Sequence, residues 1–440
     1  MPAVMTIAGV DSGGGAGIAA DLKTFAALGV HGTSVITSVT AQNTKGVLNS
    51  FNIPADFVRE QFNAVTGDIR IDCAKTGMLS SPDIVHVVAM SIKEQKLPLV
   101  IDPVMTAEAG GALLEEGAVH VLIEELLPLA IVVTPNISEA QRLTGFKIKN
   151  IYEAKKAAMN IHEIGAQAVI VTGGHLQGTD VLYAEGEFTL IEGTLLKGGT
   201  HGSGCTHSAA ITAELAKGTP LAEAARLAKK FVENAILKSM KIGKGAAPVN
   251  QLGHLLDKAE KYTVLKNVED AAYLIENDRN FPELIAEVGC NIAMGLPNAS
   301  LVSDVAAISG RIVKLKGVPH VVGCVSFGAS SHIARIVLTA MHSDSSMRAA
   351  MNIRYSQAAL EACEDFELNI SSFLREDEPE GVSTMEWGVA EAIGTTGSVP
   401  DVIYDTGGMG KEAMIRLLGR DALEVAGLAV KIGAMMKRTR

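Results

Sequence analysis

Residues 4–39 read VMTIAGVDSGGGAGIAADLKTFAALGVHGTSVITSV, and this stretch decides the fold of the first half of the chain. The β-branched runs at 4–8 and 33–39 predict two strands, and the apolar spacing at 21–28 predicts a helix between them. A strand, a crossover helix and a second strand form the unit from which parallel sheets are built. The glycine-rich turn at 11–17 connects the first strand to the helix, where such folds bind their ligands.

The same alternation continues to residue 240, with further predicted strands at 99–101, 131–133 and 168–171 and helices at 55–65, 151–164 and 206–216. This alternation of strands and helices predicts an α/β domain with a doubly wound, mostly parallel sheet that helices cover on both faces. The stretch 241–250 is rich in Gly, Ala and Pro and has no apolar period. We therefore expect a first domain at 1–245, a linker at 246–264 and a second α/β domain at 265–440.

The second domain has its own helical and extended patterns. Helices are predicted at 268–276, 331–341, 357–363, 411–418 and 422–436, and strands at 311–314, 321–325 and 402–404.

Composition restricts the class of protein. A length of 440 residues favours two domains, and a formal net charge of −11 argues against nucleic acid as a partner. The five cysteines are dispersed, as in proteins of a reducing compartment, and the N-terminus lacks the basic start of a signal peptide. Apolar runs such as 126–133 are far shorter than the ~18 residues of a membrane span. We expect a cytoplasmic protein that binds neither nucleic acid nor membranes.

The run HGSGCT at 201–206 is followed by a helical pattern. Glycines just before a helix leave its first amides free to bind an anion, so Gly202, Ser203 and Gly204 are candidate phosphate-binding residues. Cys205 stands at the start of that helix, where the helix dipole favours a thiolate and thus a general base. The alternative is a small buried thiol at a contact between helix and sheet.

Carboxylates follow two predicted strands. Asp102 comes directly after the strand at 99–101, and Glu139 lies three residues after Asn136 on one helical face. Hard oxygen ligands of this kind suit Mg²⁺. Asn136 and Glu139 also fit an ordinary capping box, and that alternative stays open.

The runs AGVDSGGGAGIAADLKTFAALGVHGTSVIT, TAQNTKGV, KTGML, DPVM, TPNISEA, TGGHL and GTHGSGCTHSAAI, in this order over residues 3–245, resemble the hydroxymethylpyrimidine and phosphomethylpyrimidine kinase family, ThiD. The resemblance implies a ribokinase-like fold and two successive ATP-dependent phosphorylations of one aminopyrimidine. It implies that the amide of Gln42, which can donate and accept at once, binds the pyrimidine. It also implies roles for further residues: Asp21, Gly9 and Met78 in the substrate pocket, Asp102 and Glu139 near Mg²⁺, and Cys205 as the base.

Two residues depart from the pattern of that family. Thr172 stands where a lysine is frequent, which weakens an expected phosphate contact, and Ser203 replaces the commoner threonine while keeping a hydroxyl. A kinase acting on pyridoxal or a related vitamin alcohol is the alternative reading of this domain.

In the second domain, arginines accompany glycine-rich and serine-rich turns. His332 and Arg335 share one face near a predicted helix start, and Asn352 and Arg354 lie in an apolar extended stretch. Lys411 ends the glycine turn at 405–411. Arginines beside helix-end amides suit phosphate or pyrophosphate, although a solvated arginine-rich surface is the plainer alternative.

Residues 265–430, with the runs RAAMNIRYS and GGMGKEAMIRLLG, resemble the ThiN domain, a thiamine-phosphate synthase. The resemblance implies that hydroxymethylpyrimidine diphosphate is joined to thiazole phosphate with loss of pyrophosphate. It implies essential roles for Arg311 and His332. From their pattern in the sequence, the candidate substrate contacts are Arg335, Asn352, Arg354 and Lys411. A ThiN-like domain that only senses thiamine phosphates is the alternative, and the first family suggests a homo-oligomer.

Overall fold

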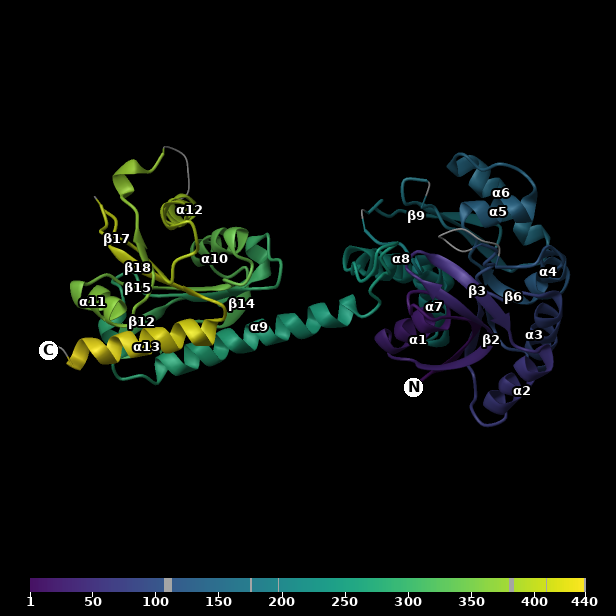
Figure 1. The fold of residues 1–440 in the computed structure, drawn as a ribbon, viewed down its shortest axis with the longest axis horizontal. Coiled ribbons are helices and arrows are strands. Elements are labelled where there is room, and N and C mark those ends of the chain that lie inside the picture. Colours follow the sequence, from purple (N-terminus) through teal and green to yellow (C-terminus); the bar gives the residue numbers. More distant parts are fainter. Residues whose placement is uncertain (107–112, 175, 197, 380–383, 409, 439–440) are drawn as a thin grey trace. The chain divides into compact units, whose positions relative to one another are not determined.

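The computed structural model describes residues 1–106, 113–174, 176–196, 198–379, 384–408 and 410–438 (Figure 1). The chain forms two compact units, Met1–Leu256 and Asp257–Arg440. Among the described residues no helix combines the length and the apolar character that a membrane crossing requires.

The first unit is built on a nine-stranded sheet in the order β3-β2-β1-β4-β5-β6-β7-β8-β9. The strands from β2 through β7 are parallel, whereas β3, β8 and β9 pair antiparallel at the two edges. Their bounds are β1 Ala3–Asp11, β2 His31–Asn43, β3 Gly46–Asn52, β4 Cys73–Thr76, β5 Leu99–Ile101, β6 Ala130–Val133, β7 Ala168–Val171, β8 Asp180–Ala184 and β9 Glu187–Ile191. The predicted doubly wound, mostly parallel sheet is confirmed.

Helices cover both faces of this sheet, because successive strand residues point to opposite sides. Val169 and Val171 of β7 join the core beneath α2, α3, α5 and α6, whereas Ala168 and Ile170 join the core beneath α1, α7 and α8. The bounds are α1 Gly17–Ala27, α2 Ala55–Thr66, α3 Pro82–Gln95, α4 Glu116–Val121, α5 Ile137–Thr144, α6 Ile151–Glu163, α7 Ser203–Ala216 and α8 Leu221–Leu237. All four helices predicted for this unit are present.

The second unit contains a seven-stranded, mainly antiparallel sheet in the order β14-β11-β10-β15-β18-β17-β16, and a separate hairpin, β12-β13. The strands are β10 Ile292–Gly295, β11 Val305–Ile308, β12 Ile312–Leu315, β13 Val318–Val321, β14 Val325–Phe327, β15 Ala349–Arg354, β16 Ile370–Ser372, β17 Val402–Asp405 and β18 Met414–Gly419. Helices α9 Gly253–Glu276, α11 Gln357–Asp365 and α13 Ala422–Arg438 pack on one face, and α10 Ser331–Ser343 and α12 Thr384–Thr396 on the other (Figure 1).

Three expectations for the C-terminal half are wrong. The helix expected at 411–418 is the inner strand β18, which pairs with both β15 and β17. The strand expected at 321–325 is divided between β13 and β14, since Gly323 has a φ of +91°. The expected linker at 246–264 is structured: Val249 is buried in the first unit, the Gln251 side-chain amide donates to Thr206 Oγ1 at 3.0 Å, and α9 begins at Gly253.

The two glycine turns of the first unit lie against each other. Gly202 has a φ of +83°, and a Cβ added there would lie 1.9 Å from the Gly15 carbonyl oxygen. A Cβ at Gly15 would lie 2.4 Å from Cδ2 of His201. Only glycine at both positions allows the turns at 11–17 and 201–204 to approach this closely.

We expect Gly202→Ala to destabilise the first unit by clearly more than Gly218→Ala. Gly218 has a similar φ of +85° but open space around its Cβ position, so its substitution adds only the left-handed backbone cost of about 1–2 kcal/mol. Urea unfolding followed by circular dichroism measures the difference, and fluorescence of Trp387, the single tryptophan, follows the second unit separately. Equal losses for the two variants would contradict the close approach.

Candidate active sites

The residues predicted to bind the pyrimidine gather where β1 and β2 end. A Cβ at Gly9 would lie 3.0 Å from Sδ of Met78, so these two residues are in contact. Gln42 follows in β2, where its side-chain oxygen lies 3.1 Å from Thr40 Oγ1 and its backbone amide donates to Ser12 Oγ. The structure thus brings Gly9, Met78 and Gln42 to one edge of the sheet.

Asp11 holds the two glycine turns together. Its carboxylate accepts the amides of Gly13, Gly15 and Ala16 at 2.8–3.0 Å, and Nε2 of His201 lies 3.0 Å from its Oδ2. Burial alone would raise the pKa of Asp11, but the bonds from His201 and the turn amides outweigh it and lower the pKa. The carboxylate is therefore ionised at neutral pH, and it fixes the turn of Gly202, Ser203 and Gly204 beside the first turn.

Asp21 does not lie on an open pocket wall. It is fully buried in α1, where Nζ of Lys75 in β4 lies 2.9 and 2.8 Å from its two carboxylate oxygens and Thr6 Oγ1 donates to it at 2.6 Å. Lys75 is a residue that the sequence analysis missed, although it opens the quoted run KTGML. Asp21 raises the pKa of Lys75 against the effect of burial, so this lysine stays charged.

Cys205 stands in the first turn of α7, as predicted. Burial raises the pKa of its thiol to about 12, the charge of Lys75 opposes this rise, and the carboxylates of Asp102 and Asp21 add to it. Removal from water outweighs the helix dipole at this position, so the pKa of the thiol is raised and not lowered as expected.

Asp102 and Glu139 are both almost completely buried and close enough to influence each other. Burial raises the pKa of Asp102 to about 6 and, with the Asp102 charge, that of Glu139 to about 8. The capping box is also present, with Asn136 N donating to Glu139 Oε2 and Glu139 N to Asn136 Oδ1, both at 2.9 Å. Two buried carboxylates that hold their protons tightly are a donor set that fits a divalent cation.

The second unit has a cavity of about 440 Å³ on the α10 and α12 side of its sheet. It is lined by three predicted residues, Arg311, His332 and Asn352, and by two arginines that the sequence analysis missed, Arg375 and Arg416. Arg416 lies on the cavity side of the sheet because side chains alternate along a strand. Its neighbours Ile415 and Leu417 enter the core beneath α9 and α13, so Arg416 points to the opposite face. Asn352 of β15 is its cross-strand partner.

Three predicted substrate contacts are not among the residues that line this cavity, namely Arg335, Arg354 and Lys411. Nε of Arg335 lies 3.4 Å from Glu386, and Nζ of Lys411 lies 3.2 Å from Glu378. Both side chains are therefore paired with carboxylates that do not line the cavity. Arg311 donates to the Val288 carbonyl oxygen and, like His332 at the start of α10, is exposed.

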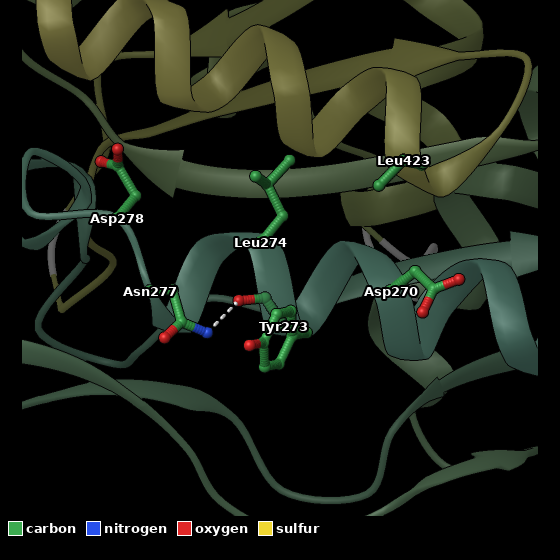
Figure 2. A pocket seen from close by; sticks show the side chains of 6 residues that line it. All are labelled: Asp270, Tyr273, Leu274, Asn277, Asp278 and Leu423. Atoms are coloured by element: carbon green, nitrogen blue, oxygen red, sulfur yellow. Dashed lines mark hydrogen bonds between the residues drawn. The ribbon is translucent and has the colours of Figure 1, made fainter.

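A second hollow, of about 460 Å³, lies between α9 and the start of α13 (Figure 2). Figure 2 shows Asp270, Tyr273, Leu274, Asn277, Asp278 and Leu423 around it, with the Asn277 side chain turned back to its own helix, where it donates to the Tyr273 carbonyl oxygen at 2.8 Å. None of these six lining residues is basic. The hollow therefore offers no cationic side chain to a phosphorylated substrate.

Both units match known families. Residues 11–250 match the family of phosphomethylpyrimidine kinase, and residues 267–431 match that of thiamine-phosphate synthase ThiN. The chain is 38% identical over 425 residues to the bifunctional thiamine biosynthesis protein ThiDN of Methanocaldococcus jannaschii, covering 96% of each chain. It is 47% identical to the hydroxymethylpyrimidine/phosphomethylpyrimidine kinase of Haemophilus influenzae, over 56% of this chain and 95% of that one.

Solved structures resemble the first unit. The pyridoxal kinase of Bacillus subtilis, in complex with ADP, is 40% identical and superposes with a TM-score of 0.54 over 58% of this chain and 99% of that one. The pyridoxal kinase of Staphylococcus aureus, in complex with AMP-PCP and pyridoxal, is 34% identical with a TM-score of 0.54, over 58% of this chain and 95% of that one. These structures support the ribokinase-like fold expected for the unit.

The raised pKa of Glu139 makes the stability of the first unit depend on pH. Because the folded chain binds this proton more tightly than the unfolded chain, stability should fall as pH rises from the ordinary 4.5 towards about 8. We expect a decrease of roughly 1–3 kcal/mol over this window, most of which Glu139→Gln should abolish. Urea unfolding at about pH 5, 6.5 and 8, without divalent cations, measures it.

Glu153→Gln is the matched control for this series, since Glu153 occupies the corresponding position after Asn150 in the exposed cap of α6. It should leave the slope as in the wild type. A wild-type stability that rises over the same window would contradict the assignment.

Proposed function

The chain belongs to the ThiDN family of bifunctional thiamine biosynthesis proteins, and from this premise we propose which residues carry each of its two reactions. The first unit phosphorylates 4-amino-5-hydroxymethyl-2-methylpyrimidine and then its monophosphate, and the second joins the diphosphate to thiazole phosphate with release of pyrophosphate. The observation that carries this assignment is a polar site in each family's domain. In the first unit it lies at the strand ends, and in the second it is a cavity lined by arginines on the α10 and α12 side of the sheet.

In the kinase unit, Gln42 orients the aminopyrimidine through its amide, and Gly9 and Met78 bound the ring. The absence of a side chain at Gly9 leaves the room that Met78 Sδ would otherwise lack. The hydroxymethyl group then faces the start of α7, where the amides of Gly202 and Gly204 donate to the oxygens of the transferred phosphoryl group. The Ser203 amide already donates to the Thr200 carbonyl oxygen at 2.9 Å, so Ser203 contributes through its hydroxyl. ATP is the phosphoryl donor in this proposal, in keeping with the nucleotide complexes of the structural relatives.

Cys205 takes the proton that the substrate hydroxyl loses as its oxygen bonds to phosphorus. Since burial raises the pKa of the thiol, it has to lose its own proton before it can act as a base. Lys75 is the group that stabilises the thiolate, because its positive charge lowers the thiol pKa. The role of Lys75 is thus to position charge beside the base rather than to touch the pyrimidine.

Asp102 and Glu139 are proposed to hold Mg²⁺ with the nucleotide. When bound, the ion offsets the negative charge of the phosphates. Asp102 Oδ2 accepts from Ser208 Oγ at 3.1 Å, and Glu139 is fixed by its capping box, so both carboxylates are held in place by the chain itself.

In the synthase unit, the thiazole nitrogen attacks the methylene carbon of the pyrimidine diphosphate, and the carbon–oxygen bond to the diphosphate breaks. The electron pair leaves with the pyrophosphate, which therefore needs cations and amide donors around it. Arg311 and the first amides of α10, which line the cavity beside His332, supply them. We assign Arg311 to the leaving group, and His332 to donating a proton to an oxygen of the departing pyrophosphate, since the attacking ring nitrogen carries no proton to remove.

Pyridoxal is the second candidate substrate of the kinase unit, because structural relatives at 34–40% identity are pyridoxal kinases. The hydroxymethylpyrimidine kinases are more similar in sequence, at 43–47% identity. An initial-rate comparison of the two alcohols, in wild type and in Gln42→Leu, separates them. Loss of selectivity for the pyrimidine in Gln42→Leu supports the assignment, whereas a wild-type preference for pyridoxal would overturn it.

The direct test is a mass-spectrometric assay of the full chain with hydroxymethylpyrimidine, thiazole phosphate, ATP and Mg²⁺. We expect thiamine phosphate from the wild type, at least a hundredfold less pyrimidine phosphate from Cys205→Ala, and accumulation of the pyrimidine diphosphate in Arg311→Ala. A hundredfold loss corresponds to about 2.7 kcal/mol of transition-state stabilisation.

Arg348→Ala is a control for the second unit, since Arg348 is not among the residues that line the cavity. Diphosphate without thiamine phosphate from the wild type would make the second unit a sensor. No phosphorylated pyrimidine at all would overturn the substrate assignment.

A further inference from the structure

One buried charged side chain in the synthase cavity has incomplete hydrogen bonding. Arg416 of β18 is 1% exposed, and its Nη2 donates to Asp405 Oδ2 at 2.8 Å. The guanidinium also lies over the ring of Phe373, with Cζ 5.1 Å from the centroid. Its other terminal nitrogen, Nη1, has no hydrogen-bond partner within the part of the chain that the structure describes. A buried charged donor without a hydrogen-bond partner lowers the stability of the fold. We therefore expect a ligand or a water molecule to accept a hydrogen bond from Nη1.

The surroundings of Arg416 favour an anion. Arg375 binds the same carboxylate, with Nε 2.5 Å from Asp405 Oδ1 and Nη2 3.1 Å from Oδ2. Two guanidinium groups therefore share one carboxylate, and this group of three residues keeps one positive charge. Both arginines line the cavity. A planar guanidinium with a free N–H edge is the donor that proteins use for phosphoryl oxygens.

The position of Arg416 differs from that of Arg311, the residue assigned to the leaving group. Arg311 is exposed and belongs to the stretch before β12, whereas Arg416 is buried on an inner strand. The start of α10, with Ser330, Ser331 and His332, lines the same cavity. The reaction assigned to this unit has two phosphorylated substrates, so it requires binding sites for two anionic groups.

We propose that Arg375 and Arg416, held by Asp405, form a second phosphoryl-binding subsite of the synthase cavity, in which Arg416 Nη1 donates to an oxygen of a substrate phosphate or diphosphate. This inference rests on the synthase function proposed above for the second unit. The two sources of the anion, the pyrimidine diphosphate and the thiazole phosphate, share the chemistry that the subsite recognises, and the kinetics distinguish them.

The single tryptophan provides a direct probe. Trp387 of α12 packs edge-on against Phe373, with ring centroids 5.8 Å apart, and Arg416 stacks on that same ring. Tryptophan fluorescence of the full chain therefore reports on the second unit alone. Inorganic pyrophosphate, titrated into the full-length protein, should change this fluorescence as it binds.

Arg416→Lys is the informative variant, because lysine keeps a positive charge for Asp405 but has no second terminal nitrogen. We expect pyrophosphate binding to weaken at least tenfold, and the KM of one phosphorylated substrate to rise by a similar factor with a smaller change in kcat. If the KM of the pyrimidine diphosphate rises, the subsite binds the diphosphate. If the KM of the thiazole phosphate rises, the subsite binds the monophosphate.

Arg348→Lys is the matched control, since Arg348 also has a buried terminal nitrogen without a hydrogen-bond partner among the described residues but does not line the cavity. It should bind pyrophosphate as the wild type does. Thermal unfolding followed by Trp387 shows whether each variant is folded. If Arg416→Lys does not fold, Arg375→Lys, whose side chain is 11% exposed, takes its place with the same expectation.

Unchanged pyrophosphate affinity and KM in a folded Arg416→Lys variant would overturn the proposal and leave a bound water as the partner of Nη1. An equal loss in Arg348→Lys would overturn it as well. If the wild type makes no thiamine phosphate but Arg416→Lys still weakens pyrophosphate binding, the subsite stands and the synthase function fails.

Discussion

The fully buried ion pair between Lys75 of β4 and Asp21 of α1 sets the electrostatics of the first unit. Removing either partner of such a pair typically costs about 3–5 kcal/mol, because the other charge stays buried without compensation. The pair therefore fixes α1, and with it the glycine turn that precedes this helix, against the middle of the sheet. It also places a permanent positive charge near Cys205 and Asp102, whose pKa values burial alone would raise further.

The candidate phosphate sites of the two units are lined by side chains of opposite charge. The kinase site has carboxylates with raised pKa values, Asp102 and Glu139, beside one lysine, so the polyphosphate binding that we propose there requires an added cation. The synthase cavity carries its own cations in Arg311, Arg375 and Arg416. This difference follows from the chemistry. A kinase guides a phosphoryl group from one oxygen to another, whereas a diphosphate that leaves a carbon atom has only to be held and stabilised.

Much of the first unit could be predicted from the sequence, because its parallel strands are apolar runs separated by helical periods. Strand β4 was missed, since four residues that include a lysine do not resemble a buried strand. The family resemblance implied that Asp102 and Glu139 lie near one ion, and in the structure the Asp102 charge is close enough to raise the pKa of Glu139. The sequence analysis did not predict three cations, Lys75, Arg375 and Arg416. Each forms an ion pair with a carboxylate elsewhere in the chain, Asp21 or Asp405. Such pairs, and the burial of the charges, are visible only in the tertiary structure. Arg416 was further hidden by the helical reading of 411–418. The low pKa expected for Cys205 failed for a related reason, since a helix start is recognisable in sequence but removal from water is not.

The bond between Asp11 and His201 joins residues 190 positions apart. Ribosomes add about 5–20 residues per second, so His201 is made roughly 10–40 s after Asp11. During that interval β1, an inner strand of the finished sheet, lacks the α7 helix that completes one of its two covering layers. The apolar N-terminal strand is thus synthesised long before its surroundings exist, which makes translation, rather than the finished enzyme, the stage at which this chain most needs protection from aggregation.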